Sequence, residues 1–345
     1  MKKYIQLYNY LRDTIECGDW APQMQLPTES ALSEQFQMSR QTVRQALAAL
    51  KKDNYIYSVR GSGSFVSPCA GKKAENKRIA VVTTYFSEYI FPSILRGICN
   101  VAVEHGYAVE LSSSNNSIKQ ERAILTQLME NSVVGIIVEG TKTTFPNPNA
   151  EIYKKLADSG TPVVFINSIY YQIKDSAFPS VVVDDYNGGY EQTKYILAQG
   201  HTHIASFFKI DDVQGYYRFQ GMLDALTESG VDFDDRNFLF YTTETKNSLI
   251  SLPPFQKILT DCTALLCYND EIVELLLPLL KDSPNKISIL ASFDQELNTN
   301  LIPQHVEYRS LLHPKERLGQ AAAEKLFNIL AGQKEGTLVL PWGEG

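Results

Sequence analysis

The feature that most constrains the fold is an alternation of short apolar runs with helical patterns, which continues from residue 79 to the end of the chain. Such alternation predicts parallel β-sheets with helices on both faces, because parallel strands need helical crossovers. One helical pattern places apolar residues at three- and four-residue spacing, namely Ile94, Leu95, Ile98, Val101 and Ala102. The apolar runs occupy residues 79–83, 133–138, 163–166, 181–183, 204–208, 264–268 and 287–293.

The chain changes character near residue 70. Its 345 residues exceed what one hydrophobic core usually organises. Residues 67–77 are small, polar and charged without an apolar period, which is typical of an exposed linker. We therefore expect one domain over residues 1–67, a linker over residues 68–78 and a second domain over residues 79–345.

Charge is divided between the two parts. Residues 1–78 contain 12 Lys and Arg against 7 Asp and Glu, whereas the remainder contains 20 against 32. A basic segment ahead of an acidic body is typical of a nucleic-acid-binding module joined to a separate domain.

Several protein classes are disfavoured by composition. No run approaches the ~18 apolar residues of a membrane span. The N-terminus lacks the apolar core of a signal peptide, so a cytoplasmic location is expected and no membrane partner. The cysteines are odd in number, scattered and without a Cys-x-x-Cys pair, which predicts neither a disulfide framework nor a zinc site; they are Cys17, Cys69, Cys99, Cys262 and Cys267.

The first part contains three helical patterns followed by a hairpin. Helices are expected over residues 3–16, 28–36 and 40–53, the last one with Ser39 as its N-cap. Two β-prone runs, 55–59 and 64–66, flank a glycine-containing turn, as in a hairpin.

The third helix has a buried stripe and a polar face. Val43, Ala46, Leu47 and Leu50 form the stripe, and the opposite side carries Arg40, Gln41, Arg44 and Gln45. Arg can donate two bonds to guanine, and Gln can pair with adenine in the major groove. A solvated face is the alternative interpretation. The short second helix and the glycine-rich turn with Arg60 favour DNA contact.

This assembly resembles the winged-helix DNA-binding domain of the GntR family. The matching residues are Leu26-Pro27-Thr28-Glu29-Ser30-Ala31-Leu32, Phe36, Ser39-Arg40-Gln41-Thr42-Val43-Arg44-Gln45-Ala46-Leu47, Leu50 and Gly61-Ser62-Gly63-Ser64-Phe65-Val66. The resemblance implies that double-stranded operator DNA is the partner. It implies DNA contacts by Arg40, Thr42 and Arg44, with Gln41 on the same face, and further contact positions at Glu29, Arg60, Gly61 and Gly63. Glu29 could accept a hydrogen bond from cytosine N4 or could orient an arginine.

The second part contains no assembled catalytic motif. It lacks a P-loop and a Gly-x-Gly-x-x-Gly turn, and its histidines lack the His-x-x-x-His spacing of a helical metal site. His201 and His203 could chelate in principle, but their place between a helix end and a strand favours a structural role. We therefore expect no enzyme activity, no metal and no cofactor.

Polar and aromatic residues follow the predicted strands. The carboxyl ends of parallel strands are where open α/β sheets bind ligands. Sugars need paired hydrogen-bond donors and acceptors together with aromatic faces, so the set predicts a carbohydrate site. Taken singly, each residue could instead cap a helix, brace a carboxylate or be solvated. The candidates are Tyr89, Phe91, Glu139, Asn167, Lys209, Asp211, Arg218, Asn269 and Asp294.

The second part also resembles the effector domain of the LacI/GalR family, a two-lobed fold similar to periplasmic sugar-binding proteins. The matching residues are Gly200-His201-x-x-Ile204, Gln214-x-x-x-Arg218-x-x-Gly221, Tyr268-Asn269-Asp270, Ile287-Ser288-Ile289-Leu290-Ala291-Ser292-Phe293-Asp294 and His313-Pro314 with Leu318-Gly319 and Ala321-Ala322. The resemblance places Asn167, Arg218, Asn269 and Asp294 at effector-contact positions. The sequence departs from the family at Ser292, where glycine is usual, and at Gln295, where a second aspartate is usual.

The pairing of these two domain types resembles the arabinose repressors of Gram-positive bacteria. The residues behind this are the stretch 83–94, Glu139-Gly-Thr-Lys142 and Phe208-Lys209-x-Asp211-Asp212-x-Gln214-Gly215. The resemblance implies L-arabinose as inducer and arabinose-use operons as targets. We expect the repressor to act as a homodimer. Another pentose, a hexose or a sugar phosphate is the alternative effector, and a transport-type binding protein or a sugar-modifying enzyme are alternatives from other classes. The family that the chain resembles usually continues a little beyond Pro341-Trp342-Gly343.

Overall fold

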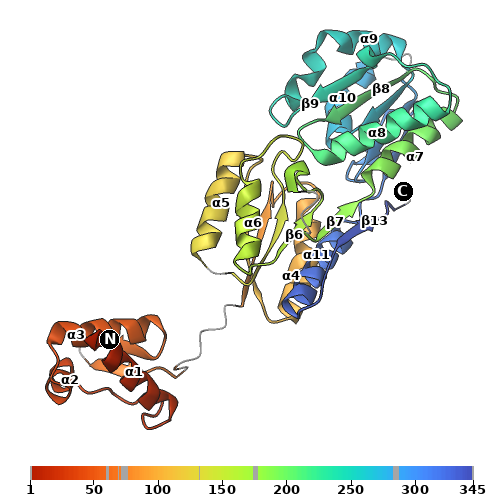
Figure 1. The fold of residues 1–345 in the computed structure, drawn as a ribbon. Helices are drawn as coiled ribbons and strands as arrows, with labels where there is room; N and C mark the ends of the chain where they lie inside the picture. Colours follow the sequence, from red (N-terminus) through yellow and green to blue (C-terminus); the bar gives the residue numbers. More distant parts are fainter. Residues whose placement is uncertain are drawn as a thin grey trace. The chain divides into compact units, whose positions relative to one another are not determined.

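The computed structural model describes residues 2–59, 62–68, 70, 77–131, 133–173, 178–282 and 287–343. The chain divides into two compact units, Met1–Asn76 and Lys77–Gly345 (Figure 1). The α/β fold class predicted from the sequence is confirmed. Most of the predicted linker, including Cys69 and residues 71–76, lies outside the described residues, and its limits stay a prediction.

The smaller unit is a winged helix-turn-helix. Its helices are α1 (Lys3–Glu16), α2 (Glu29–Gln35) and α3 (Arg40–Lys52), and its hairpin pairs β1 (Ile56–Val59) with β2 (Gly63–Val66). The hydroxyls of Thr28 and Ser39 accept hydrogen bonds from the first turns of α2 and α3, as N-caps do. Fully buried side chains from all three helices form the core, among them Leu7, Leu11, Leu32, Val43 and Leu50.

The larger unit contains two lobes, each built on a parallel sheet. Among the described residues the first sheet has six strands in the order β13-β7-β6-β5-β3-β4, and the second has five in the order β12-β11-β10-β8-β9. The first sheet comprises β3 (Arg78–Thr83), β4 (Ala108–Ser113), β5 (Gly135–Glu139), β6 (Val163–Ile166), β7 (Ser180–Val183) and β13 (Thr337–Leu340). The second comprises β8 (Ile204–Lys209), β9 (Phe238–Tyr241), β10 (Ala264–Cys267), β11 (Ile289–Phe293) and β12 (Glu307–Leu311).

Helices cover both faces of the first sheet. Ile79 and Val81 of β3 pack into one hydrophobic core, whereas Ala80 and Val82 pack into another on the opposite face. This alternation follows from the two-residue period of a strand. The first core is completed by α4 (Phe91–Glu104) and α11 (Lys315–Leu330), and the second by α5 (Ile118–Glu130) and α6 (Ala150–Asp158).

The second lobe begins where the chain leaves β7 for α7 (Asp185–Ala198). Its other α-helices are α8 (Val213–Glu228), α9 (Pro253–Asp261) and α10 (Asp270–Asp282). Helices α7 and α8 pack with their backbones in contact, because a methyl group at Gly189 would overlap the carbonyl group of Arg218. No helix in the described ranges is long and apolar enough to cross a membrane.

The seven predicted strands are all present, with ends shifted by at most two residues. The sequence did not predict β4, β9, β12 or β13, and each of these lies at an edge of its sheet. An edge strand is covered less completely than a central one, so it need not be a continuous apolar run.

Candidate functional sites

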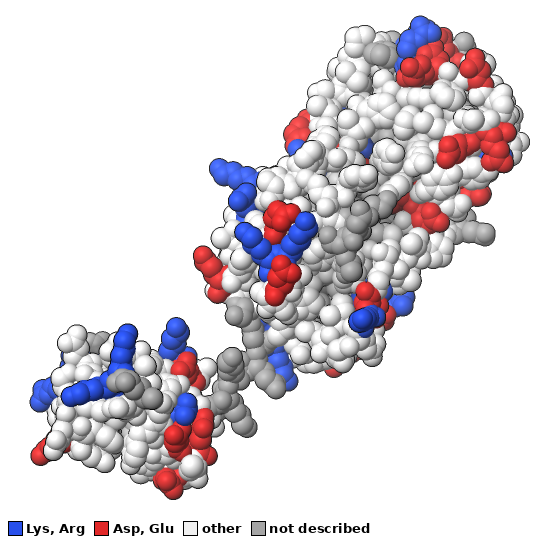
Figure 2. Space-filling view, viewed as in Figure 1, with Lys and Arg blue, Asp and Glu red and all other residues white. Residues whose placement is uncertain are grey.

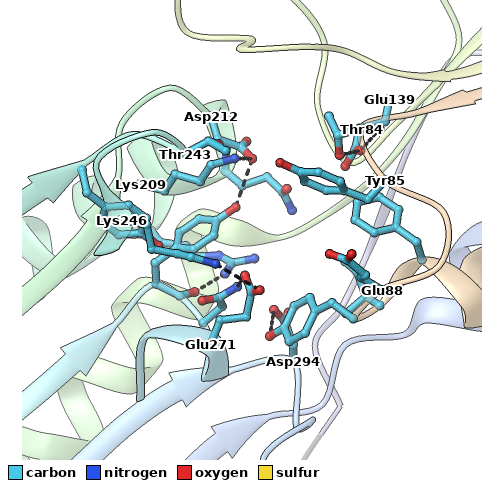
Figure 3. A pocket seen from close by; sticks show the side chains of 18 residues that line it. Thr84, Tyr85, Glu88, Glu139, Lys209, Asp212, Thr243, Lys246, Glu271 and Asp294 are labelled. Carbon is cyan, nitrogen blue, oxygen red and sulfur yellow. Dashed lines mark hydrogen bonds and ion pairs between the residues drawn. The ribbon is translucent and has the colours of Figure 1, made fainter. Parts of the chain in front are cut away.

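A pocket of about 190 Å³ lies between the two lobes of the larger unit (Figure 3). This is well above the roughly 10–15 Å³ that one water needs and suits a single small ring. One wall comes from the first lobe, with Thr84, Tyr85, Glu88, Tyr89, Ile90, Phe91 and Glu139. The other comes from the second lobe, with Lys209, Asp212, Gln214, Arg218, Tyr241, Thr243, Lys246, Tyr268, Asn269, Glu271 and Asp294.

The pocket forms where parallel strands end. Glu139 is the last residue of β5 and Lys209 the last of β8, while Asp294 directly follows β11. In open α/β sheets, ligands bind in the crevice outside the carboxyl ends of the strands, where side chains can reach them. The rule that predicted the site therefore also accounts for its position.

The first-lobe wall is organised by the buried carboxylate of Glu139. Its Oε2 accepts hydrogen bonds from the backbone N–H of Thr84, at 3.0 Å, and from the Thr84 hydroxyl, while Oε1 accepts from Nδ2 of Asn167 at 2.7 Å. Burial raises the pKa of Glu139, and these hydrogen bonds partly offset the rise.

The second-lobe wall is built around the buried guanidinium of Arg218. Its Nε donates to Oδ1 of Asp185 at 2.8 Å, and Nη1 donates to the carbonyl of Tyr268 at 2.5 Å. The same group lies 4.4 Å from the ring centre of Phe293 and 4.9 Å from that of Trp342. Charge, hydrogen bonds and aromatic faces thus hold Arg218 in one position.

The lysine of the pocket is also paired. Nζ of Lys209 lies 3.5 Å from Oδ2 of Asp212 and 3.7 Å from Oδ1 of Asp211. Burial opposes protonation, but the two carboxylates outweigh it and raise the pKa of Lys209. The described lining contains five acidic and three basic side chains, so the pocket carries an excess of negative charge.

Asp294 has an unused hydrogen-bond acceptor. Its Oδ2 accepts from the hydroxyl of Tyr89 at 2.6 Å, whereas its buried Oδ1 has no hydrogen-bond partner among the described residues. Burial raises the pKa of this carboxyl to about 6, against the opposing influence of Arg218. A buried acceptor without a donor is costly, which makes Oδ1 a position for a ligand hydroxyl.

The structure brings together seven of the nine sequence-predicted residues; Asn167 and Asp211 do not line the pocket. Asn167 supports Glu139 from behind. Asp211 turns inward and accepts from Nδ2 of Asn116 and the backbone N–H of Thr243, both at 3.2 Å. Residues beyond the predicted nine include Tyr85, Glu88, Thr243, Lys246 and Glu271.

Contacts outside the pocket also join the lobes. The side chain of Lys142 forms an ion pair with Glu244, and the hydroxyl of Thr144 donates to the carbonyl of Ile210 at 2.5 Å. Glu244 is held charged, since the hydrogen bond from Lys142 lowers its pKa to about 2. These contacts connect the loop after β5 to the second lobe and stabilise the arrangement in which the pocket is enclosed.

The second candidate site is the exposed face of α3. Arg40, Gln41 and Arg44 are exposed there, and Thr42 is half-buried with its hydroxyl 2.9 Å from that of Ser39. Nε of Arg44 donates to Oε2 of Glu29 at 2.7 Å. Of the two roles considered for Glu29, the orientation of an arginine is the one that this contact supports.

The hairpin beside α3 is held to the helical part of its unit. Gln25 forms a β-bridge with Phe65, and its side chain donates to the carbonyl of Ser62 at 2.6 Å. Gly63 has a φ of 106°, which a side chain would strain. The predicted contact residues Arg60 and Gly61 lie outside the described residues. Figure 2 shows several Lys and Arg side chains on the visible face of this unit, interspersed with acidic ones.

The described parts of the chain contain no candidate metal site and no disulfide. They contain no group of three or more His, Cys, Asp or Glu side chains that could hold a metal ion. The ring of His201 contacts the hydroxyls of Thr263 and Ser288 at 2.8 and 3.3 Å, which accounts for it structurally. The described cysteines are free thiols.

Comparison with known protein families matches both units. Residues 3–66 match the gntR family of bacterial regulatory proteins, and residues 76–340 match the periplasmic binding proteins and sugar binding domain of the LacI family. The chain belongs to the LacI sugar-binding family, with a GntR-type DNA-binding domain.

Relatives agree over nearly the whole length of the chain. The arabinose metabolism transcriptional repressor of Geobacillus stearothermophilus is 36% identical, covering 96% of this chain and 92% of that protein. Its counterpart in Halalkalibacterium halodurans is 34% identical, covering 95% and 90%. The crystal structure of transcription regulator CcpA of Lactococcus lactis shares the fold, with a TM-score of 0.63 and 23% identity over 76% of this chain and 95% of that one. This protein is thus a sugar-responsive transcriptional repressor of the combined GntR and LacI type.

Proposed function

We propose that this repressor binds operator DNA of arabinose-utilisation genes and is released from it by L-arabinose bound between the lobes. The sugar is suggested by the two arabinose metabolism repressors that are 36% and 34% identical to the chain. The observation that carries a sugar site is the buried, unpartnered Oδ1 of Asp294, which needs a hydroxyl donor.

A neutral monosaccharide fits the pocket better than a sugar phosphate. Lys209 and Arg218 could in principle hold a phosphate, but Lys209 is paired with Asp211 and Asp212, and Arg218 with Asp185. With both cations engaged and acidic groups in excess, a dianion would meet net repulsion. A neutral ring would accept from these cations and donate to the carboxylates.

The nine residues predicted from the sequence divide into two roles under this proposal. Tyr89, Phe91, Glu139, Lys209, Arg218, Asn269 and Asp294 line the pocket and would contact the sugar. Asn167 and Asp211 would act through their neighbours, since Asn167 positions Glu139 and Asp211 positions Lys209.

The DNA contacts are assigned to the exposed face of α3 and to the wing. Arg40, Gln41, Thr42 and Arg44 would enter the major groove, with Glu29 holding Arg44. The wing, with Arg60, Gly61 and Gly63, would follow the neighbouring backbone. Two such units in a homodimer would contact the two halves of a pseudo-palindromic operator.

Induction follows from linkage between the two sites. If the sugar stabilises one angle between the lobes, it changes the spacing of the two DNA-binding units in the dimer. Operator affinity then falls, and by reciprocity bound operator weakens sugar binding by the same factor. The segment around residues 68–78 would transmit this change as a linker.

Titration calorimetry against a panel of sugars tests the assignment. L-arabinose should bind with one site per chain and more tightly than D-xylose, D-ribose, D-galactose and L-arabinose 5-phosphate. Stronger binding of another neutral sugar would identify that sugar as the effector in place of L-arabinose. Stronger binding of the phosphate would refute the preference for a neutral ligand. Turnover of the bound pentose would instead indicate an enzyme.

A further inference from the structure

A second cavity, of about 380 Å³, lies at the junction of the lobes and is distinct from the sugar pocket. It is bordered by the ends of β6 and β7, the edge strand β13 and the first turns of α7 and α8. Both lobes therefore contribute to its lining, and none of the described residues lines both cavities.

The two cavities share a wall made of two hydrogen-bonded pairs. Glu139 lines the sugar pocket, and its partner Asn167 lines the second cavity. Arg218 likewise lines the sugar pocket, whereas its partner Asp185 lines the second cavity. The distances within these pairs are 2.7 and 2.8 Å, so a group that moves Asn167 or Asp185 acts directly on the sugar site.

One residue of this second lining carries a buried acceptor without a partner. Asn167 is 2% exposed, and its Oδ1 has no hydrogen-bond partner among the described residues. The orientation of the amide is fixed, because Nδ2 must face the carboxylate of Glu139, which accepts but does not donate. A ligand at this place would therefore need an N–H or O–H group.

The other residues of the lining favour a positively charged ligand with a flat or apolar body. The described lining contains the carboxylates of Asp184 and Asp185 and no Lys or Arg. Rings of Tyr171, Tyr186 and Tyr217 also border the cavity. Asp185 is already paired with Arg218, so the charge offered to a ligand is that of Asp184. A carboxylate beside aromatic faces attracts an organic cation, because the ring faces are electron-rich.

We propose that this cavity is a second ligand site, which takes a small organic ammonium ion with an aromatic or apolar body. The ammonium group lies near Asp184 and donates to Oδ1 of Asn167, and the ring packs against the tyrosines. Since the site borders both lobes and the shared wall, its occupancy changes sugar affinity. That coupling rests on the proposed sugar site, whereas binding of the cation does not.

Calorimetry with tyramine as the probe tests the site on the full chain without sugar. Tyramine should bind with one site per chain, and 4-hydroxyphenylacetate, which has the same ring but the opposite charge, should not bind.

Variants of the lining test the placement of the cation. Asp184→Asn removes the charge but keeps a residue type that caps α7 well, and it should weaken tyramine binding by about fivefold. Tyr171→Ala alters a ring that is 78% exposed and is not needed for folding, and should also weaken binding. The matched control Asp158→Asn, at an exposed position, should leave it unchanged.

The outcomes separate this site from the sugar pocket. Saturating L-arabinose should change tyramine affinity without abolishing binding, and tyramine should change arabinose affinity by the same factor. Equal binding of the anion, full displacement of tyramine by arabinose, or unchanged binding by both site variants would overturn the proposal. Tyramine binding with no mutual effect would overturn the coupling. A second molecule of arabinose in this cavity would replace the proposed cation by a sugar.

Discussion

The hydroxyl of Tyr89 donates to Oδ2 of Asp294 at 2.6 Å and so joins the two lobes across the sugar pocket. Tyr89 precedes α4 in the first lobe, and Asp294 follows β11 in the second. Both have positive φ angles, 55° and 89°, which side chains rarely adopt. Backbone strain of this kind is retained at functional sites. The bond occupies Oδ2 and leaves Oδ1 without a hydrogen-bond partner among the described residues.

Replacement of Asp294 should separate sugar binding from DNA binding. Asp294→Asn removes the charge at Oδ1, and loss of a charged hydrogen bond costs about 1.5–3 kcal/mol, or roughly 10- to 150-fold in sugar affinity. Calorimetry measures the sugar affinity, and fluorescence anisotropy measures binding to operator DNA, which should persist. Asp235→Asn, at an exposed position of the same lobe, is the control. Normal sugar release from the Asp294 variant would place the site elsewhere.

Sugar affinity should depend on pH near 6. The pKa of Asp294 is raised to about 6 by burial. A sugar hydroxyl that donates to the carboxylate lowers this pKa, so binding releases a proton and affinity falls as the pH drops below about 6. Calorimetry in buffers of different ionisation enthalpy measures the released proton. A sugar affinity that does not vary between about pH 5 and 8 would contradict the role of Asp294.

The same carboxyl groups affect the stability of the sugar-free protein. The pKa of Asp185 is also raised to about 6 by burial. Because the folded-state pKa of each group exceeds its unfolded value near 3.9, protonation favours the folded state. Their contribution to the unfolding free energy thus increases as the pH falls from about 7 toward 4. Comparison of denaturation of the wild type and Asp294→Asn over this range isolates it; parallel pH profiles would refute the shift.

Arg44 should contribute to operator recognition. Arg44→Ala should cost on the order of 1–3 kcal/mol in operator binding if its guanidinium contacts a guanine. Glu29→Gln should cost less, since it loosens the orientation of Arg44 without removing the contact. Arg12→Ala, on α1, serves as the control. An operator affinity unaffected by Arg44→Ala would remove Arg44 from the interface.

The ion pair between Lys142 and Glu244 should favour the enclosed pocket without contacting the sugar. Glu244 is 59% exposed in its side chain, so the pair is screened and its loss should weaken sugar binding by no more than about fivefold. In a double-mutant cycle, Lys142→Ala and Glu244→Ala should not be additive. Additive effects would show that the pair does not couple the lobes.

Central strands could be predicted from the sequence and edge strands could not. Residues 163–166 form an apolar run and are β6, buried on both faces. The edge strand β4 instead contains only exposed and half-buried residues, so no continuous apolar run marks it. Its place in the sheet depends on pairing with β3, a long-range contact that local patterns do not encode.

The same difference explains three of the pocket residues that the sequence did not predict. Tyr241, Thr243 and Lys246 lie at or after the end of β9, an edge strand that was itself missed. Asp211 was favoured over Asp212, although both follow β8; the turn before α8 directs Asp211 inward and Asp212 into the pocket. Strand ends can be identified from a pattern, whereas the direction of each side chain depends on the turn.

The most direct test is operator affinity with and without sugar. An operator fragment selected by the full-length protein from a random DNA library is titrated by fluorescence anisotropy at fixed ionic strength, because affinity for DNA depends strongly on salt. Saturating L-arabinose should weaken binding by about tenfold or more, a coupling free energy of at least about 1.4 kcal/mol. The Asp294→Asn variant should bind the same DNA without this response. Equal operator affinity of the wild type in the presence and absence of saturating arabinose would contradict the account.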